Sequence, residues 1–93
     1  MNNVQIGFSK QSLKFLHRNQ HIINKKQVCD GIIQAVKKLT KEEITTADVI
    51  ALHGELDGFF RLRLDSVRVI FSIEFGYIHI VEVEQIDFRG NVY

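Results

Sequence analysis

The chain has 93 residues, of which 45% are hydrophobic and 25% are charged, and its formal net charge is +1. This length fits a single domain over residues 1–93 and excludes a second domain. The near-neutral charge argues against a general nucleic-acid-binding protein, because such proteins usually carry a clearly basic domain.

The first predicted element is a strand at Val4–Phe8, where apolar residues alternate with small or polar ones. Ser9 predicts the start of a helix, because its hydroxyl can accept a backbone N–H group of the first turn. A second helix is predicted over Ile22–Leu39 from its apolar spacing. Gly31 can kink this helix, since glycine costs about 1 kcal/mol relative to alanine in a helix interior. The two helices would form a hairpin.

The segment from Thr40 to Asp57 has the least regular pattern of the chain. Its residues 45–48 predict one more short turn of helix. Gly54 and Gly58 predict turns on either side of Leu56.

From Phe59 onward the apolar residues recur with a period of two, which predicts strands. The strand at residues 59–64 is followed by a tight turn at Asp65-Ser66, a strand at residues 67–75 and a last strand at residues 78–85. Strands joined by such short turns form an antiparallel meander, to which Val4–Phe8 can add an edge strand. The predicted fold class is therefore α+β, with the order β-α-α-β-β-β and a two-helix hairpin packed on one face of a curved antiparallel sheet.

Three arginines stand out in the meander. Arg61 and Arg63 share one face of their strand, and Arg68 lies just beyond the tight turn on the side away from the apolar residues. If the apolar face meets the helices, the three guanidinium groups converge on the opposite face, where they can bind phosphate or carboxylate. The alternative is a solvated face on which these arginines pair with an acid such as Glu82, Glu84 or Asp65, at a gain of only about 0–1 kcal/mol per pair.

The second half of the chain contains four motifs, which are Leu52-His53-Gly54, Phe60-Arg61-Leu62-Arg63, Val67-Arg68-Val69-Ile70-Phe71 and Phe88-Arg89-Gly90-Asn91-Val92-Tyr93. In this order they resemble the RelE/ParE superfamily of bacterial toxin–antitoxin proteins, and the resemblance covers the whole chain. A weaker match is Ser9-Lys10 followed by Leu13-Lys14-Phe15-Leu16.

The resemblance implies a RelE-like fold and a metal-independent mRNA endonuclease that acts on the ribosome. In such enzymes the ribose 2′-OH attacks the adjacent phosphate and leaves a 2′,3′-cyclic phosphate. By the motifs, Arg61, Arg63 and Arg89 match basic positions that bind RNA, and Arg68 matches the arginine that stabilises the transition state. Tyr93 matches the tyrosine that stacks on a base and orients or deprotonates the 2′-OH. These five residues form the implied catalytic set, and the substitution Arg68→Ala is expected to abolish toxicity with the fold intact.

Two other functions remain open. A ParE-like member of the superfamily inhibits DNA gyrase and is not a nuclease, and an inactive homologue would only bind an antitoxin. Phe88 stands where many relatives have histidine, arginine is a poor proton acceptor, and Asp87 would repel phosphate. These three features leave the choice between the functions undecided.

The expected partners follow from the same resemblance. They are a cognate antitoxin in a hetero-oligomer, and either the ribosome with its mRNA or DNA gyrase. We expect no cofactor and no metal, because the single cysteine, Cys29, and four histidines show no metal-ligand spacing. The sequence shows neither a signal peptide nor an apolar stretch of membrane-spanning length, so we expect a cytoplasmic protein without a membrane partner.

Overall fold

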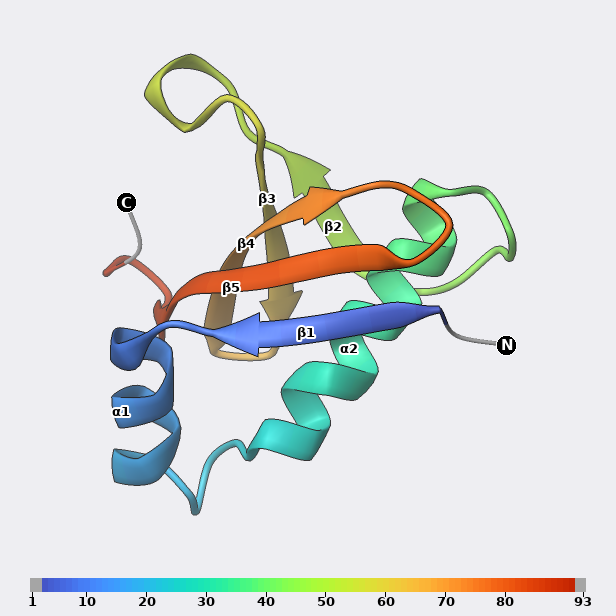
Figure 1. The fold of residues 1–93 in the computed structure, drawn as a ribbon. Coiled ribbons are helices and arrows are strands. Elements are labelled where there is room, and N and C mark those ends of the chain that lie inside the picture. Colours follow the sequence, from blue (N-terminus) through green and yellow to red (C-terminus); the bar gives the residue numbers. More distant parts are fainter. Residues whose placement is uncertain (1–2, 92–93) are drawn as a thin grey trace.

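The structure is a computed structural model and describes residues 3–91. Five strands form one curved sheet, and two helices pack against it (Figure 1). In chain order the elements are β1 (Val4–Phe8), α1 (Lys10–Arg18), α2 (Lys25–Leu39), β2 (Asp48–Ala51), the short 3-10 helix η1 (Gly54–Leu56), β3 (Phe59–Leu64), β4 (Val67–Glu74) and β5 (His79–Phe88). Among the described residues, no helix is both long and apolar enough to cross a membrane.

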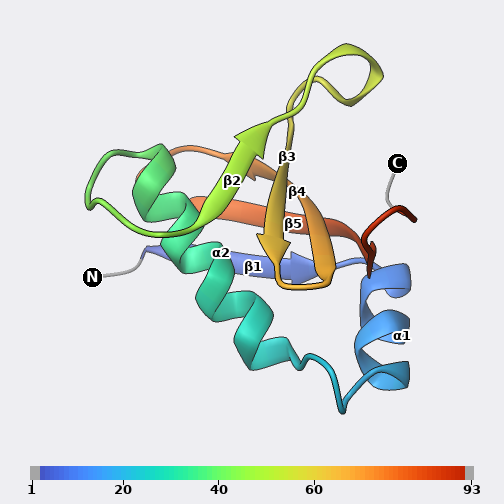
Figure 2. The same ribbon diagram turned by 180° about the vertical axis from the view of Figure 1, so that it is seen from behind.

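The sheet has the strand order β1-β5-β4-β3-β2. Its centre is the predicted antiparallel meander of β3, β4 and β5. The predicted edge strand β1 is present, and it runs parallel to β5, so the sheet is mixed rather than purely antiparallel (Figure 2). The parallel arrangement is possible because both helices lie in the long connection that separates these two strands in the chain.

The other edge strand, β2, was not predicted. The expected helical turn over residues 45–48 is wrong, because β2 begins at Asp48 and pairs antiparallel with β3. Only Val49 of this strand packs towards the core, and so short a pattern carries little strand signal of its own. Pairing with β3 therefore decides its conformation. The short helical turn of this region is η1, between Gly54 and Gly58, which have φ angles of 74° and 93°.

Side-chain caps set where both helices begin. As predicted, Ser9 caps α1: its hydroxyl accepts the N–H of Ser12 at 3.2 Å and donates to the carbonyl of Glu84 on β5 at 2.7 Å. Helix α2 begins at Lys25 rather than Ile22, because Asn24 and Gln27 form a reciprocal capping box.

Helix α2 continues through Gly31 without the predicted interruption. A Cβ atom at this position would lie 3.1 Å from Leu62 and 3.0 Å from Leu64. The missing side chain therefore allows α2 to pack closely on β3, which accounts for the glycine without a break in the helix.

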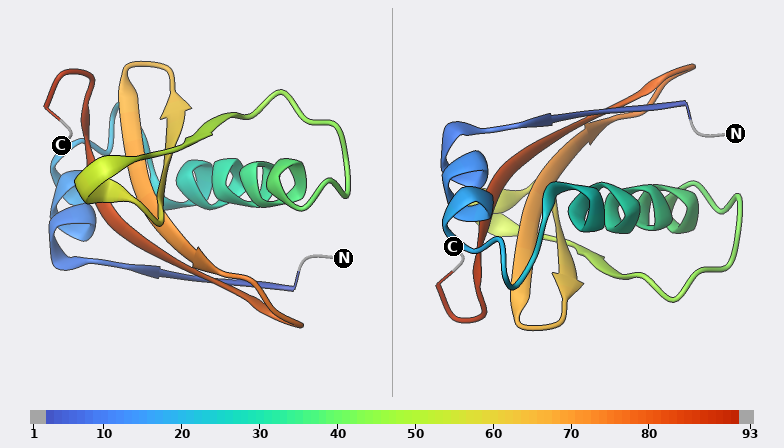
Figure 3. Two further views of the ribbon diagram at one scale, coloured as in Figure 1. Left: turned by 90° about the horizontal axis from the view of Figure 1, so that it is seen from above. Right: turned by 90° about the horizontal axis from the view of Figure 1, so that it is seen from below.

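The hydrophobic core lies between the helices and one face of the sheet, with α1 on β5 and α2 on β3. Seen from above and below, α2 lies between the two edges of the curved sheet (Figure 3). The core contains Phe15, Leu16, Ile23, Val28, Ile32, Ala35, Val36, Leu62, Val67, Val69, Phe71, Val81, Val83 and Ile86.

An irregularity in the β4–β5 pairing determines which residues of β5 face the core. Phe71 pairs with Val83 while Ile70 pairs with Gln85, so β5 has one extra residue, Glu84. Because of this bulge, Val83 and Ile86 both face the helices. Asp87 consequently lies on the opposite face, directly across from Arg68.

Candidate active site

The arginines of the meander meet on the sheet face that points away from the helices. Arg63 of β3 is the direct cross-strand neighbour of Arg68 on β4, and Arg61 lies two residues along β3 on the same face. The neighbouring core residues Leu62, Val67 and Val69 point the other way. The structure therefore confirms that the three arginines lie on the same face of the sheet.

Arg68 is the most enclosed of these arginines, with only 6% of its surface exposed. Its Nη1 atom donates to the carbonyls of Asp65 at 2.6 Å and Val67 at 3.1 Å. Loss of solvent contact, together with the positive charges of Arg63, Arg61 and Arg89, lowers the pKa of the Arg68 guanidinium from its ordinary value, and Asp48 partly offsets this. Arg68 is thus a fixed positive charge inside a cluster of like charges.

Asp48 is the acidic partner of the cluster. Its Oδ1 atom lies 3.2 Å from Nη2 of Arg61, and its Oδ2 atom lies 3.6 Å from Nη1 of Arg63. The expected pairing of Arg61 and Arg63 with Glu82, Glu84 or Asp65 is not what these contacts show, because β2 brings Asp48 directly opposite Arg63. The Nε atom of Arg61 is buried and has no hydrogen-bond partner.

The segment after β5 brings a further arginine towards the cluster. The backbone N–H of Arg89 donates to the carbonyl of Ser66 at 2.9 Å, which ties this segment to the β3–β4 turn. The Arg89 side chain is exposed, and its positive charge helps to lower the pKa of Arg68 from its ordinary value. Tyr93, the fifth residue of the implied catalytic set, lies outside the described residues.

Phe88 packs against the hydrophobic core. It is paired with Val67, so it lies on the helix side of the sheet, and its ring makes an edge contact with Phe15 at a centroid distance of 5.0 Å. Arg68 and Asp87 point to the other side at this level of the sheet. A side chain at position 88 therefore supports the core and does not reach the arginine cluster.

Within the described part of the chain, Asp48 and Asp87 lie beside the arginine cluster, and only Asp87 was expected there from the sequence. Asp87 is the β5 neighbour of Arg68, but its Oδ1 atom accepts the backbone N–H of Phe88 at 2.8 Å. Asp48 was missed because it lies 13 residues from Arg61 in the chain, at the start of an unpredicted strand. Pairing of β2 with β3 places Asp48 opposite Arg63, so a prediction of β2 would have revealed this acid.

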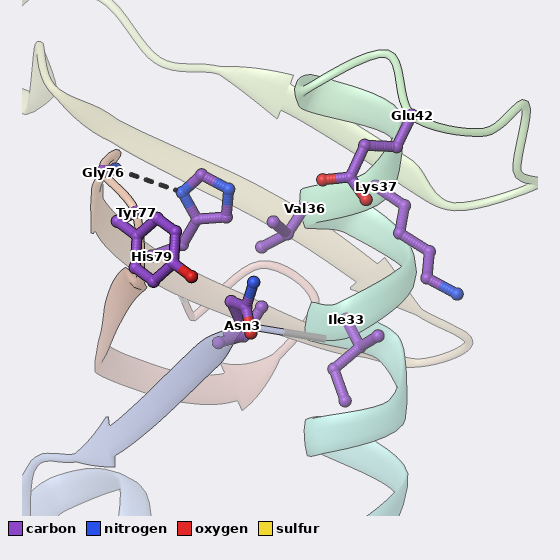
Figure 4. A pocket seen from close by; sticks show the side chains of 9 residues that line it. Asn3, Ile33, Val36, Lys37, Glu42, Gly76, Tyr77 and His79 are labelled. Carbon is purple, nitrogen blue, oxygen red and sulfur yellow. Dashed lines mark hydrogen bonds between the residues drawn. The ribbon is translucent and has the colours of Figure 1, made fainter. Parts of the chain in front are cut away.

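A pocket of about 280 Å³ lies elsewhere in the molecule, between α2, the start of β1 and the β4–β5 turn (Figure 4). Ile33, Val36 and Lys37 line it on one side, and Tyr77 and His79 line it on the other. None of the clustered arginines borders it. Within residues 3–91, no group of three or more histidine, cysteine or acidic side chains is arranged to hold a metal ion.

The fold is similar to that of several solved toxins. The toxin–antitoxin complex DinJ–YafQ from E. coli contains a chain with a TM-score of 0.66 and 12% identity, with 98% of each chain covered. A YoeB/ParE toxin from Agrobacterium tumefaciens gives a TM-score of 0.62 at 15% identity, covering 91% of this chain and 98% of that one.

The RelBE2 toxin–antitoxin complex from Mycobacterium tuberculosis gives a TM-score of 0.55 at 20% identity, covering 91% of this chain and 96% of that one. No protein-family model matches the sequence, and no curated protein matches it. The similarity is therefore carried by the arrangement of the helices and strands, and it shows that this chain shares the α+β fold of these solved toxins.

Proposed function

We propose that this protein is the toxin of a type II toxin–antitoxin pair and that it cleaves mRNA on the ribosome without a metal ion. The observation that carries the proposal is the pairing of Arg63 with Arg68 across β3 and β4, with Arg61 and Arg89 nearby. Like charges directly opposite each other destabilise a sheet. A pair of arginines in this arrangement is expected where a polyanion is the ligand.

The reaction would begin with attack of the ribose 2′-oxygen on the adjacent phosphorus. The bond between phosphorus and the 5′-oxygen then breaks, which leaves a 2′,3′-cyclic phosphate and a free 5′-hydroxyl. The proton of the 2′-OH passes to a base, and the departing 5′-oxygen receives a proton from an acid. The developing negative charge lies on the non-bridging oxygens, where fixed positive charges stabilise the transition state most effectively.

Arg68 suits this stabilising role, because its hydrogen bonds to two backbone carbonyls fix its position before the substrate binds. Arg61, Arg63 and Arg89 would hold the flanking phosphates. Arginine is a poor base because it stays protonated, so we assign the orientation or deprotonation of the 2′-OH to Tyr93. This last assignment depends on the sequence motif alone.

The direct test uses purified protein and ribosomes stalled on a defined mRNA with an open A site. Primer extension maps any cuts, and the same mRNA without ribosomes is the control. We expect cuts only with ribosomes, and we expect Arg68→Lys to lose them. Arg18→Ala removes an exposed arginine at the end of α1 and should cut like the unmodified protein.

A ParE-like inhibitor of DNA gyrase is the second candidate. It is favoured by the composition of the cluster, because Arg61, Arg63, Arg68 and Arg89 are all poor proton acceptors. Growth arrest with DNA-damage induction, and without mRNA cuts under either condition, would support the gyrase inhibitor. Overexpression without any growth defect would support an inactive, antitoxin-binding homologue.

An antitoxin is the proposed partner in all three cases. Several proteins with this fold were solved as toxin–antitoxin complexes, including YoeB–YefM from Staphylococcus aureus. We expect the partner of this chain to carry acidic residues, because the arginine cluster offers charge-assisted hydrogen bonds to carboxylates. Co-purification with the product of an adjacent small gene would test this expectation.

A further inference from the structure

Asp48 contacts two arginines of the cluster, one with each of its carboxylate oxygens. One carboxylate oxygen lies 3.2 Å from Arg61 and the other lies 3.6 Å from Arg63. A phosphodiester has two non-bridging oxygens, which bind neighbouring guanidinium groups in the same manner. A phosphate bound to Nη2 of Arg61 and Nη1 of Arg63 would therefore have to take the place of the Asp48 carboxylate.

The exposure of the three side chains indicates that this exchange is feasible. The side chains of Asp48 and Arg63 are 48% and 50% exposed, whereas the Arg61 side chain is only 19% exposed. Exposed ion pairs contribute only about 0–1 kcal/mol to stability, so breaking such a pair costs little free energy. Arg61, in contrast, is mostly buried and keeps a buried Nε–H donor without a hydrogen-bond partner.

The charge balance of the cluster identifies Asp48 as its main counter-charge. The positive charges of Arg61, Arg63 and Arg89 all act on Arg68, and Asp48 is the acid that opposes them. Asp87 lies across from Arg68, but its carboxylate accepts a hydrogen bond from the backbone of Phe88. Asp48 therefore offsets part of the positive charge of the cluster in the free protein.

We infer that Asp48 is an intramolecular competitor of the RNA phosphate, which occupies the anion site of Arg61 and Arg63 until a phosphodiester displaces it. The inference deepens the proposed function and rests on it for the identity of the anion. It makes Asp48 a determinant of RNA affinity, because every bound phosphate at this position must first displace the carboxylate.

The test measures binding of a short 2′-O-methyl RNA, which cannot be cleaved because it has no free 2′-OH. Asp48→Asn is compared with the unmodified protein by fluorescence anisotropy over a range of salt concentrations. Asp30→Asn is the matched control, since Asp30 is an exposed acid paired with Lys26 at 2.8 Å on α2. Both variants raise the net charge by one unit, so an effect of overall charge would appear in both.

We expect Asp48→Asn to bind the RNA about two- to fivefold more tightly, the range that corresponds to an exposed ion pair worth up to about 1 kcal/mol. The plot of log affinity against log salt should become steeper by about 0.7, because one more cation is available to a single-stranded phosphate backbone. Asp30→Asn should leave both values unchanged. Thermal unfolding checks the fold, and Asp48→Ser provides a second way to remove the charge.

Equal affinities for the unmodified protein and Asp48→Asn would overturn the inference, as would an equal gain in Asp30→Asn. Weaker binding by Asp48→Asn would also overturn it, because the carboxylate would then position the arginines rather than compete for them. If none of the three proteins binds the RNA at low salt, the arginines do not form an anion site and the inference is wrong. If Asp48→Asn binds the RNA more tightly but the unmodified protein cuts no mRNA on ribosomes, the inference is supported and the proposed nuclease activity is refuted.

Discussion

Arg63 on β3 and Arg68 on β4 lie directly opposite each other, one residue pair away from the tight turn that joins the two strands. The two side chains differ in environment, because Arg63 is half-exposed whereas Arg68 is nearly enclosed and is bonded to the carbonyls of Asp65 and Val67. Arg63 is thus open to solvent, whereas Arg68 beside it is a positive charge held in position by the backbone.

The first prediction concerns the substitution of Arg68. Arg68→Ala should abolish mRNA cleavage and also lower the free energy of unfolding by about 1–3 kcal/mol, because two hydrogen bonds to backbone carbonyls are lost. The fold should stay intact, as expected from the sequence, with a smaller free energy of unfolding. Arg68→Lys keeps the charge and should be more stable than Arg68→Ala, but it cannot reproduce the planar guanidinium contacts.

The two effects are separated by urea denaturation and by ribosome-dependent cleavage at a temperature where each variant is folded. Arg18→Ala serves as the control for loss of an arginine outside the cluster. Full cleavage by folded Arg68→Ala would exclude a catalytic role for this residue.

The second prediction concerns Phe88, the position at which many relatives have histidine. Phe88→His should lower the free energy of unfolding by about 1–3 kcal/mol, since a polar ring would replace the apolar contact with Phe15. Cleavage activity should not increase, because the side chain lies on the face opposite Arg68. Tyr77→His is the control, as Tyr77 is 93% exposed and should tolerate the change. An increase in cleavage by Phe88→His would show that position 88 reaches the site.

The third prediction tests the cap that joins α1 to β5. Ser9→Ala removes the acceptor for the N–H of Ser12 and the donor to the carbonyl of Glu84. The free energy of unfolding should fall by about 1–2 kcal/mol, as measured by urea denaturation. Ser66→Ala changes an exposed serine in the β3–β4 turn and should have a smaller effect. Equal stability of Ser9→Ala and the unmodified protein would show that the cap is dispensable.

The fourth prediction concerns the pH dependence of Cys29. Burial raises the pKa of the Cys29 thiol, Lys25 opposes the rise and Asp30 adds to it. Because the thiolate is the reactive form, iodoacetamide should modify the folded protein more slowly at pH 8 than the urea-unfolded protein. The rate in the folded state should rise at higher pH than for an ordinary thiol.

The same shift has a consequence for stability. The unfolded chain releases the thiol proton first, at about pH 8.5, so the contribution of Cys29 to the free energy of unfolding decreases as the pH rises above that value. Cys29→Ser should lack this part of the pH dependence. Alkylation at the same rate in the folded and unfolded states would contradict the raised pKa.

The sequence by itself determined the local features of the site. The alternation along Phe59–Leu64 places Arg61 and Arg63 on one face, and the two-residue turn at Asp65-Ser66 brings the following strand, with Arg68, beside them. Ser9 marked the start of α1 for an equally local reason, since a helix cap needs only the next three residues. Each of these features depends on neighbours within a few positions, so the pattern of residue types was sufficient to predict it.

The tertiary structure decided the features that depend on residues far apart in the chain. It paired β2 with β3 and so placed Asp48 between two arginines, it set β1 parallel to β5, and it introduced the bulge that directs Asp87 to the face of Arg68. These pairings follow from the free energy of the whole core, in which the short apolar patterns of β1 and β2 fit only one position against the sheet. The basic half of the site is therefore encoded locally, whereas its acidic counterpart exists only because the chain folds back on itself.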